Sequence, residues 1–176
     1  MSIIQLVKTA LLGPVRLILG AEKYETLRYY GYRFFARDQG YTKKYYESIE
    51  AANCKVYDLL AQALVDVFHP CSVVDVGCGS GGISIALRDR GVRDIFPFDF
   101  SHASVAMAKS RGLLFAKRLD LTRAQRIPAA ADLCICLEVE ENIPKKFEHH
   151  VVWLLAQVSP MSIFQLYHHD KAGICT

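Results

Sequence analysis

The stretch with the clearest chemical potential lies at residues 73–82, where an acid precedes a run of glycines. A β-branched run contains Asp75, and residues 83–87 have a helical pattern, so a strand, a tight turn and a helix are predicted here. Glycine backbone in such a turn can approach a nucleotide-like ligand closely. The spacing of the glycines fits both GxGxG and GxGxxG and does not by itself choose the ligand. The four residues concerned are Gly77, Gly79, Gly81 and Gly82.

Asp75 separates the ligands that the glycine spacing leaves open. A pyrophosphate is anionic and is repelled by a carboxylate two residues before the first glycine, whereas a cationic ligand is attracted, directly or through water. S-adenosylmethionine (SAM) presents a sulfonium and an ammonium. The stretch from Asp75 to Gly81 resembles the acid-x-Gly-x-Gly-x-Gly motif of the class I SAM-dependent methyltransferases. The resemblance implies that this stretch, Cys78 included, holds the cofactor SAM; a turn without a ligand is the alternative.

A second acid follows the next predicted strand. Asp99 lies 22 residues after Gly77, where an acid at a strand end can accept both hydroxyls of a ribose. The family resembled commonly has acid-x-Ser here, and this chain reads Asp99-Phe100-Ser101. The resemblance therefore implies that Asp99 and Phe100 contact the cofactor. The alternative is that Asp99 only caps the following helix.

The third predicted strand is followed by Asp120 and Leu121. In the family resembled, such a pair contacts the adenine amino group and ring, so both are candidates for cofactor binding. A loop carboxylate without a ligand is the alternative for Asp120.

Candidate residues for the methyl acceptor follow the fourth predicted strand. Glu138, Glu141 and Pro144 match the family pattern Glu-x-x-Glu-His-x-Pro, but Asn142 replaces its histidine. Losing the imidazole removes a good metal ligand, so no metal is predicted. His168 follows the fifth predicted strand and could act as a general base or orient the acceptor. Glu138, Glu141 and His168 are the catalytic candidates. The alternatives are stabilisation of the helix dipole by Glu140 and Glu141, and a solvated loop histidine at position 168.

Strands and helices that alternate along the chain must position these residues. Strands are predicted at 72–76, 95–99, 113–119, 131–139 and 162–166. This pattern predicts an α/β fold, a doubly wound and mainly parallel sheet with strand order 3-2-1-4-5. Pro97 predicts a short or bulged second strand. A long helix over 49–67 should pack its apolar stripe against the sheet, namely Ile49, Ala52, Val56, Leu59, Leu60, Ala63 and Val67.

The resemblance covers roughly residues 41–166 and predicts two domains. Residues 1–45 would form an N-terminal helical extension, with Tyr41 and Tyr45 as a lid. Residues 46–176 would form a Rossmann-like SAM-binding domain that lacks the family's last two strands, since the chain ends about ten residues after the fifth. An exposed fifth strand would need cover from the N-terminal helices, a second copy or a partner chain. The apolar first twenty residues favour a helix docked on the domain or a partner, with peripheral membrane contact as the alternative.

The charge and cysteine content of the chain limit its possible functions. The net charge of +3 does not argue for nucleic acid, and the six cysteines form no CxxC pair, which favours a cytoplasmic protein with reduced thiols. The favoured function is methyl transfer from SAM to a small-molecule or carbohydrate-like acceptor. The alternative is a truncated SAM-binding subunit with an assembly or regulatory role and little activity. A nucleotide-sugar or NAD-binding oxidoreductase is disfavoured by Asp75.

Overall fold

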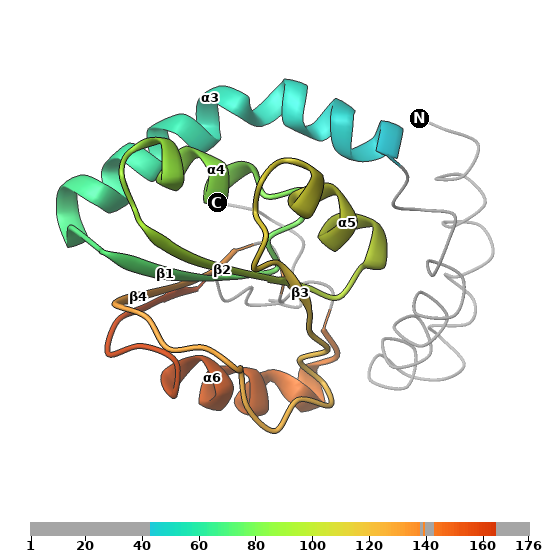
Figure 1. The fold of residues 1–176 in the computed structure, drawn as a ribbon. Coiled ribbons are helices and arrows are strands. Elements are labelled where there is room, and N and C mark those ends of the chain that lie inside the picture. The colour runs from blue at the N-terminus through green and yellow to red at the C-terminus, as the bar shows by residue number, and fades with distance from the viewer. Residues whose placement is uncertain (1–42, 138, 140–142, 165–176) are drawn as a thin grey trace, which may run out of the picture.

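Five strands of the computed structural model, which describes residues 43–137, 139 and 143–164, form one sheet of order β3-β2-β1-β4-β5 (Figure 1). Every neighbouring pair is parallel. The predicted fold class and strand order are therefore confirmed. The strands are β1 (Ser72–Val76), β2 (Asp94–Asp99), β3 (Lys117–Arg118), β4 (Leu133–Cys136) and β5 (Ser162–Phe164).

Helices cover both faces of the sheet, as Figure 1 shows. One face carries α3 (Lys43–Phe68), α4 (Gly82–Asp89) and α5 (His102–Ser110). The other carries α6 (Glu148–Ala156), which continues the 3₁₀ turn η2 (Lys145–Phe147). Among the described helices, none is long and apolar enough to cross a membrane.

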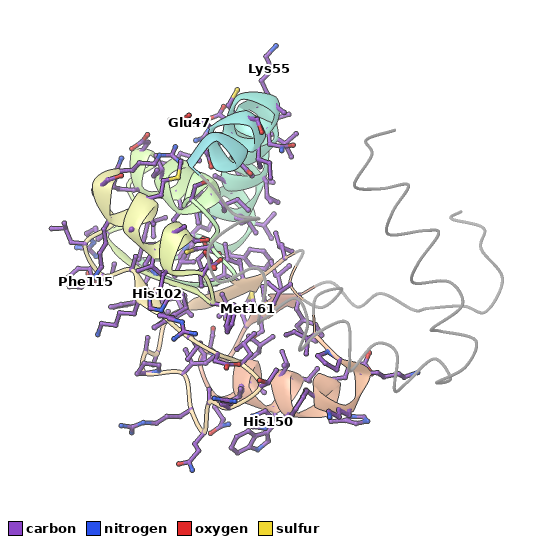
Figure 2. The ribbon with its side chains drawn as sticks, turned by 90° about the vertical axis from the view of Figure 1, so that its right-hand side faces the viewer. Glu47, Lys55, His102, Phe115, His150 and Met161 are labelled. Carbon is purple, nitrogen blue, oxygen red and sulfur yellow. The ribbon has the colours of Figure 1, made fainter. Side chains whose placement is uncertain are left out.

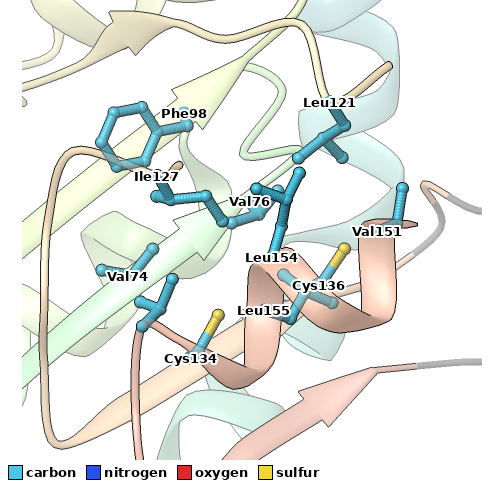
Figure 3. Packing of buried hydrophobic residues seen from close by; sticks show 11 residues of the cluster. Val74, Val76, Phe98, Leu121, Ile127, Cys134, Cys136, Val151, Leu154 and Leu155 are labelled. Carbon is cyan, nitrogen blue, oxygen red and sulfur yellow. The ribbon is translucent and has the colours of Figure 1, made fainter. Parts of the chain in front are cut away.

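The core has a separate layer on each face of the sheet. Val74 and Val76 of β1 pack toward α6 with Cys134, Leu154 and Leu155 (Figure 3). Val73 packs with the opposite layer, which includes Ala61, Leu64, Leu87 and Ile135. Because side chains alternate along a strand, Asp75 shares the face of Val73 and points toward the α4 layer.

The contact face of α3 differs from the predicted stripe. Val56, Leu59 and Val67 are 56%, 71% and 66% exposed, while Ala61 and Leu64 are buried. The prediction that the whole stripe packs on the sheet is therefore wrong. The sequence offers two overlapping apolar stripes, and the small Ala61 lets the helix axis approach the sheet. Figure 2 shows Lys55, in the middle of α3, pointing away from the sheet.

Pro97 does not shorten or bulge β2, which runs unbroken through six residues. Pairing with β3 begins only at Phe98 and Lys117. Asp99, which has the same parity as Pro97, directs its carbonyl to Leu119 N on the β3 side, at 2.9 Å. The nitrogen of Pro97 thus faces the same side just before the ladder starts, where no strand hydrogen bond is lost.

The third strand is shorter than the predicted 113–119. Leu113 and Ala116 belong instead to a small apolar cluster with Ala108 of α5. Ala116 N donates to Leu113 O at 3.0 Å, so these residues form a turn and not an extended strand. The fourth strand is also shorter than the predicted 131–139. The predicted fifth strand over 162–166 is described only as far as Phe164, since residues 165 and 166 lie outside the described residues. Of the predicted extension over residues 1–45, residues 1–42, with Tyr41, lie outside the described residues, and residues 43–45 belong to α3.

Candidate ligand site at the glycine-rich turn

The turn between β1 and α4 depends on left-handed backbone. Gly77, Gly79 and Gly81 have φ values of +81°, +54° and +88°, which residues with a Cβ rarely adopt. Gly77 N and Cys78 N both donate to Phe98 O, at 2.7 and 3.0 Å. The turn is therefore fastened to the end of β2. The turn follows β1, which lies between β2 and β4 at the point where the strand order reverses. Ligands usually bind at this point in such sheets.

Neighbouring side chains leave no room at two of these glycines. A Cβ on Gly77 would overlap Cγ2 of Val139, and a Cβ on Gly81 would overlap Cδ1 of Leu113. The segment after β4 and the turn after α5 thus press directly on the glycine backbone. These positions need glycine for both space and backbone angle.

Asp99 and the turn, both predicted as parts of one site, are in contact. Gly79 N donates to Asp99 Oδ2 at 2.9 Å, and Ser101 N donates to Asp99 Oδ1 at 2.7 Å. Burial raises the pKa of Asp99, although these hydrogen bonds act in the opposite direction. The cap of α5 is Ser101, whose Oγ accepts from Ser104 N at 3.3 Å. The Asp99 carboxylate is thus directed at the turn.

Asp75 is buried behind the turn, with 4% of its surface exposed. Its Oδ2 accepts from Ser84 Oγ at 2.6 Å. Burial raises the pKa of Asp75 from 3.8 to about 7, and the nearby charge of Asp99 adds to the shift. Two carboxyl groups with raised pKa values therefore lie next to the same turn. Such a site favours a cationic ligand.

Ser84 was not among the predicted site residues. It lies in the first turn of α4, between Ile83 and Ile85, where the apolar neighbours hide its role. In the sequence, the one sign of a role for Ser84 was its hydroxyl within an apolar helical pattern, nine residues after Asp75.

The remaining cofactor candidates have defined surroundings. Thr122 donates to Asp120 Oδ1 through its backbone N and through Oγ1, at 3.1 and 2.7 Å. Leu121 is 7% exposed and belongs to the α6-side core. The guanidinium of Arg118 lies 5.1 Å from the centre of the Phe100 ring. Burial raises the pKa of the Cys78 thiol, so Cys78 is an uncharged, buried part of the turn. Their contacts with a cofactor stay predictions.

The three catalytic candidates, Glu138, Glu141 and His168, lie outside the described residues. Within the described ranges, no group of three His, Cys, Asp or Glu side chains is placed to hold a metal ion. The roles assigned to the three candidates stay predictions.

A parallel sheet of this order, with an acid-flanked glycine turn after its first strand, matches the Rossmann-like fold that methyltransferases use. Residues 74–152 match the family model described as a methyltransferase domain, which spans Asp75, the turn, Asp99 and Asp120. The sequence of residues 74–152 and the strand order thus both resemble those of the class I SAM-dependent methyltransferases.

Two curated relatives are the ubiquinone biosynthesis O-methyltransferases of Idiomarina loihiensis and Pseudomonas paraeruginosa. They are 33% and 32% identical to this chain over 78 and 79 residues, which are 41% and 42% of the chain. The chain spans about a third of the length of these relatives, 32% and 34%.

Solved structures share the fold. The plantazolicin methyltransferase BpumL, crystallised with a desmethyl-plantazolicin analog and S-adenosylhomocysteine (SAH), has a TM-score of 0.57 and 14% identity; the likeness covers 85% of this chain and 58% of that one. The magnesium protoporphyrin IX methyltransferase ChlM of Synechocystis, with bound SAM, has a TM-score of 0.51 and 21% identity over 84% of this chain and 71% of that one. DesVI of Streptomyces venezuelae has a TM-score of 0.55 and 16% identity, covering 65% and 51%.

Proposed function

We propose that this chain binds SAM at the glycine-rich turn and transfers its methyl group to a small-molecule acceptor. The observation that carries the proposal is the Asp99 carboxylate bonded to Gly79 N at 2.9 Å, next to the buried Asp75. This arrangement brings two carboxyl groups to one glycine-rich turn. The match of residues 74–152 to the methyltransferase domain family supports the same ligand.

Different residues of the site would interact with different parts of the cofactor. Each Asp99 carboxylate oxygen accepts one backbone hydrogen bond and has a further lone pair for a ribose hydroxyl. Asp75 would contribute negative charge behind the sulfonium and ammonium groups. Asp120 and Leu121 would contact the adenine.

When bound, SAM supplies an activated methyl group, whose bond to sulfur breaks as the bond to the acceptor nucleophile forms. The protein would mainly hold the two partners in line, because orientation alone can supply a large share of the rate. Glu138, Glu141 and His168 would face the acceptor and position its nucleophilic atom. The names of the curated relatives support an oxygen nucleophile on a small molecule.

The second candidate is a SAM-binding subunit without turnover. The observation that favours it is Asn142, which replaces the histidine of the family pattern and removes a group that could exchange a proton near neutral pH. Incubating the full chain with methyl-labelled SAM and a panel of phenols, hydroxylated quinone precursors and sugars separates the two. Labelled product supports the enzyme; cofactor binding without product supports the subunit.

Calorimetric titration of SAH tests the shared part of both candidates. Asp99→Asn keeps the shape of the side chain but removes its charge, and the affinity should fall at least about tenfold, as expected when charge-assisted hydrogen bonds are lost. Asp94→Asn is the matched control, since it neutralises an exposed carboxylate at the opposite end of β2. No heat from the wild type, or equal affinities for wild type and Asp99→Asn, would contradict a SAM site here.

A further inference from the structure

Two elements distant in sequence meet at the residue in the middle of the turn. Ser80 Oγ donates to Glu50 Oε1 of α3. Arg111, the residue that caps the end of α5, places Nη1 2.8 Å from Glu50 Oε2 and donates from the same atom to Ser80 O at 3.0 Å. Glu50, Ser80 and Arg111 therefore close a ring of contacts, which we call the Glu50–Arg111 bracket.

The bracket is partly shielded from water. The side chains of Glu50 and Arg111 are 18% and 32% exposed, and Ser80 is 3% exposed. An exposed ion pair contributes little, but a partly buried pair that also satisfies other polar groups holds its geometry more firmly. Both the hydroxyl and the carbonyl of Ser80 are engaged, so the orientation of this peptide is fixed from two directions.

Gly82 shows how closely α3 lies against the turn. A Cβ at Gly82 would fall 2.5 Å from Cδ2 of Tyr57 and 2.9 Å from Glu50 Oε1. The start of α4 thus lies directly under α3, with no space for a side chain. Asp99 holds Gly79 from the end of β2, and the bracket holds the next residue, Ser80, from α3 and α5.

We propose that Glu50 and Arg111 are positioning residues for the cofactor, acting through Ser80 on the backbone of the turn. This proposal rests on the proposed function, because the turn is its SAM site. The bracket holds Ser80 between the left-handed residues Gly79 and Gly81, and so keeps Gly79 N against the Asp99 carboxylate before the ligand arrives. The same pair links α3 to the site. Glu50 itself is not expected to contact the cofactor.

Calorimetric titration of SAH into the full chain tests this role, because it measures the affinity and the number of competent sites separately. Glu50→Gln and Arg111→Gln should each weaken SAH binding by about tenfold, the size of coupling expected for one connected network, with the number of sites unchanged. The double variant should bind about as well as the weaker single variant, since either change opens the bracket. Arg111→Lys, which keeps the charge, should be intermediate and guards against misfolding of the Gln variant.

Asp58→Asn is the matched control. It breaks another contact of α3, the 2.6 Å pair between Asp58 Oδ1 and Arg90 Nη2, which ties α3 to the end of α4 away from the turn. This variant should leave the SAH affinity unchanged and alter the melting temperature only slightly, because the Asp58 side chain is 64% exposed. If the bracket only stabilised the fold, the Glu50 and Arg111 variants would have a lower melting temperature and fewer competent sites. Their dissociation constant for SAH would be unchanged.

The outcomes separate this inference from the proposed function. If wild type and Asp58→Asn bind SAH, Asp99→Asn binds weakly, and the bracket variants bind within twofold of wild type, the inference is wrong and the SAM site stands. Equal weakening by Asp58→Asn and Glu50→Gln would also overturn it. If the wild type binds no SAH, both proposals fail together.

Discussion

Replacing Asp75 with Asn should change how stability depends on pH. The carboxyl is 4% exposed and burial raises its pKa from 3.8 to about 7. The folded protein therefore holds this proton more tightly than the unfolded chain does. Between pH 4 and pH 7, ionisation of Asp75 favours the unfolded chain, so its contribution to the free energy of unfolding falls as the pH rises. Asn at this position carries no charge at any pH and removes that decline.

The expected size follows from the pKa shift. A shift of about three pKa units at 1.36 kcal/mol per unit corresponds to about 4 kcal/mol between pH 4 and pH 8. Asn can still accept the hydrogen bond from Ser84 Oγ, while its extra N–H groups cost about 1–3 kcal/mol if unpaired. That cost is the same at every pH. The difference in free energy of unfolding, Asp75→Asn minus wild type, should therefore rise by about 4 kcal/mol across this range.

Urea unfolding followed by circular dichroism at pH 4, 5, 6, 7 and 8 measures this difference. Asp99 titrates in both proteins, so most of its contribution cancels. Asp94→Asn, which removes an exposed carboxylate from β2, controls for the loss of one negative charge. Parallel curves for wild type and Asp75→Asn would refute the reasoning, because they would mean that Asp75 titrates alike in the folded and unfolded chains.

Two further predictions concern the turn. Gly81→Ala should destabilise the protein more than Gly91→Ala: both glycines have similar angles, +88° and +91°, but only at Gly81 does the new Cβ overlap Leu113, whereas nothing lies within 4 Å at Gly91. The left-handed backbone should cost each variant about 1–2 kcal/mol of unfolding free energy. The additional loss in Gly81→Ala should shrink when Leu113→Ala is added. Equal losses for the two glycine variants in thermal unfolding would contradict the packing of Leu113 on Gly81. The ratio of SAM to SAH affinity should rise up to about tenfold from pH 6 to pH 8 as Asp75 ionises toward the sulfonium, and Asp75→Asn should abolish that rise in calorimetry.

The sequence was sufficient where the signal is local. Asp75, Gly77 and Asp99 lie in short segments whose spacing fixes a strand, a turn and a second strand end, and parallel order brings those ends together. The alternation of strands and helices likewise predicted the sheet order. These inferences need only the nearest residues and the regular geometry of the sheet.

Other features depend on contacts between distant residues. The orientation of α3 is decided by Ala61, Leu64 and the close approach of Tyr57 to Gly82, and the competing stripe through Leu59 has the same helical period. Glu50 and Ser80 are thirty residues apart. No periodicity in the sequence connects them, so the bracket could be found only once the helices were placed.

The two buried acids also explain why this turn should respond strongly to a cationic ligand. Burial raises the pKa of both Asp75 and Asp99, and the charge of Asp99 adds repulsion to the ionisation of Asp75. Ligand-free protein therefore reaches neutral pH with a carboxyl pair that is costly to ionise fully. A ligand that brings a positive charge beside them offsets that cost, and its binding free energy includes the stabilisation of the second negative charge. On this reasoning, the same pair that lowers the stability of the ligand-free fold should favour a cationic ligand such as SAM over a neutral nucleoside.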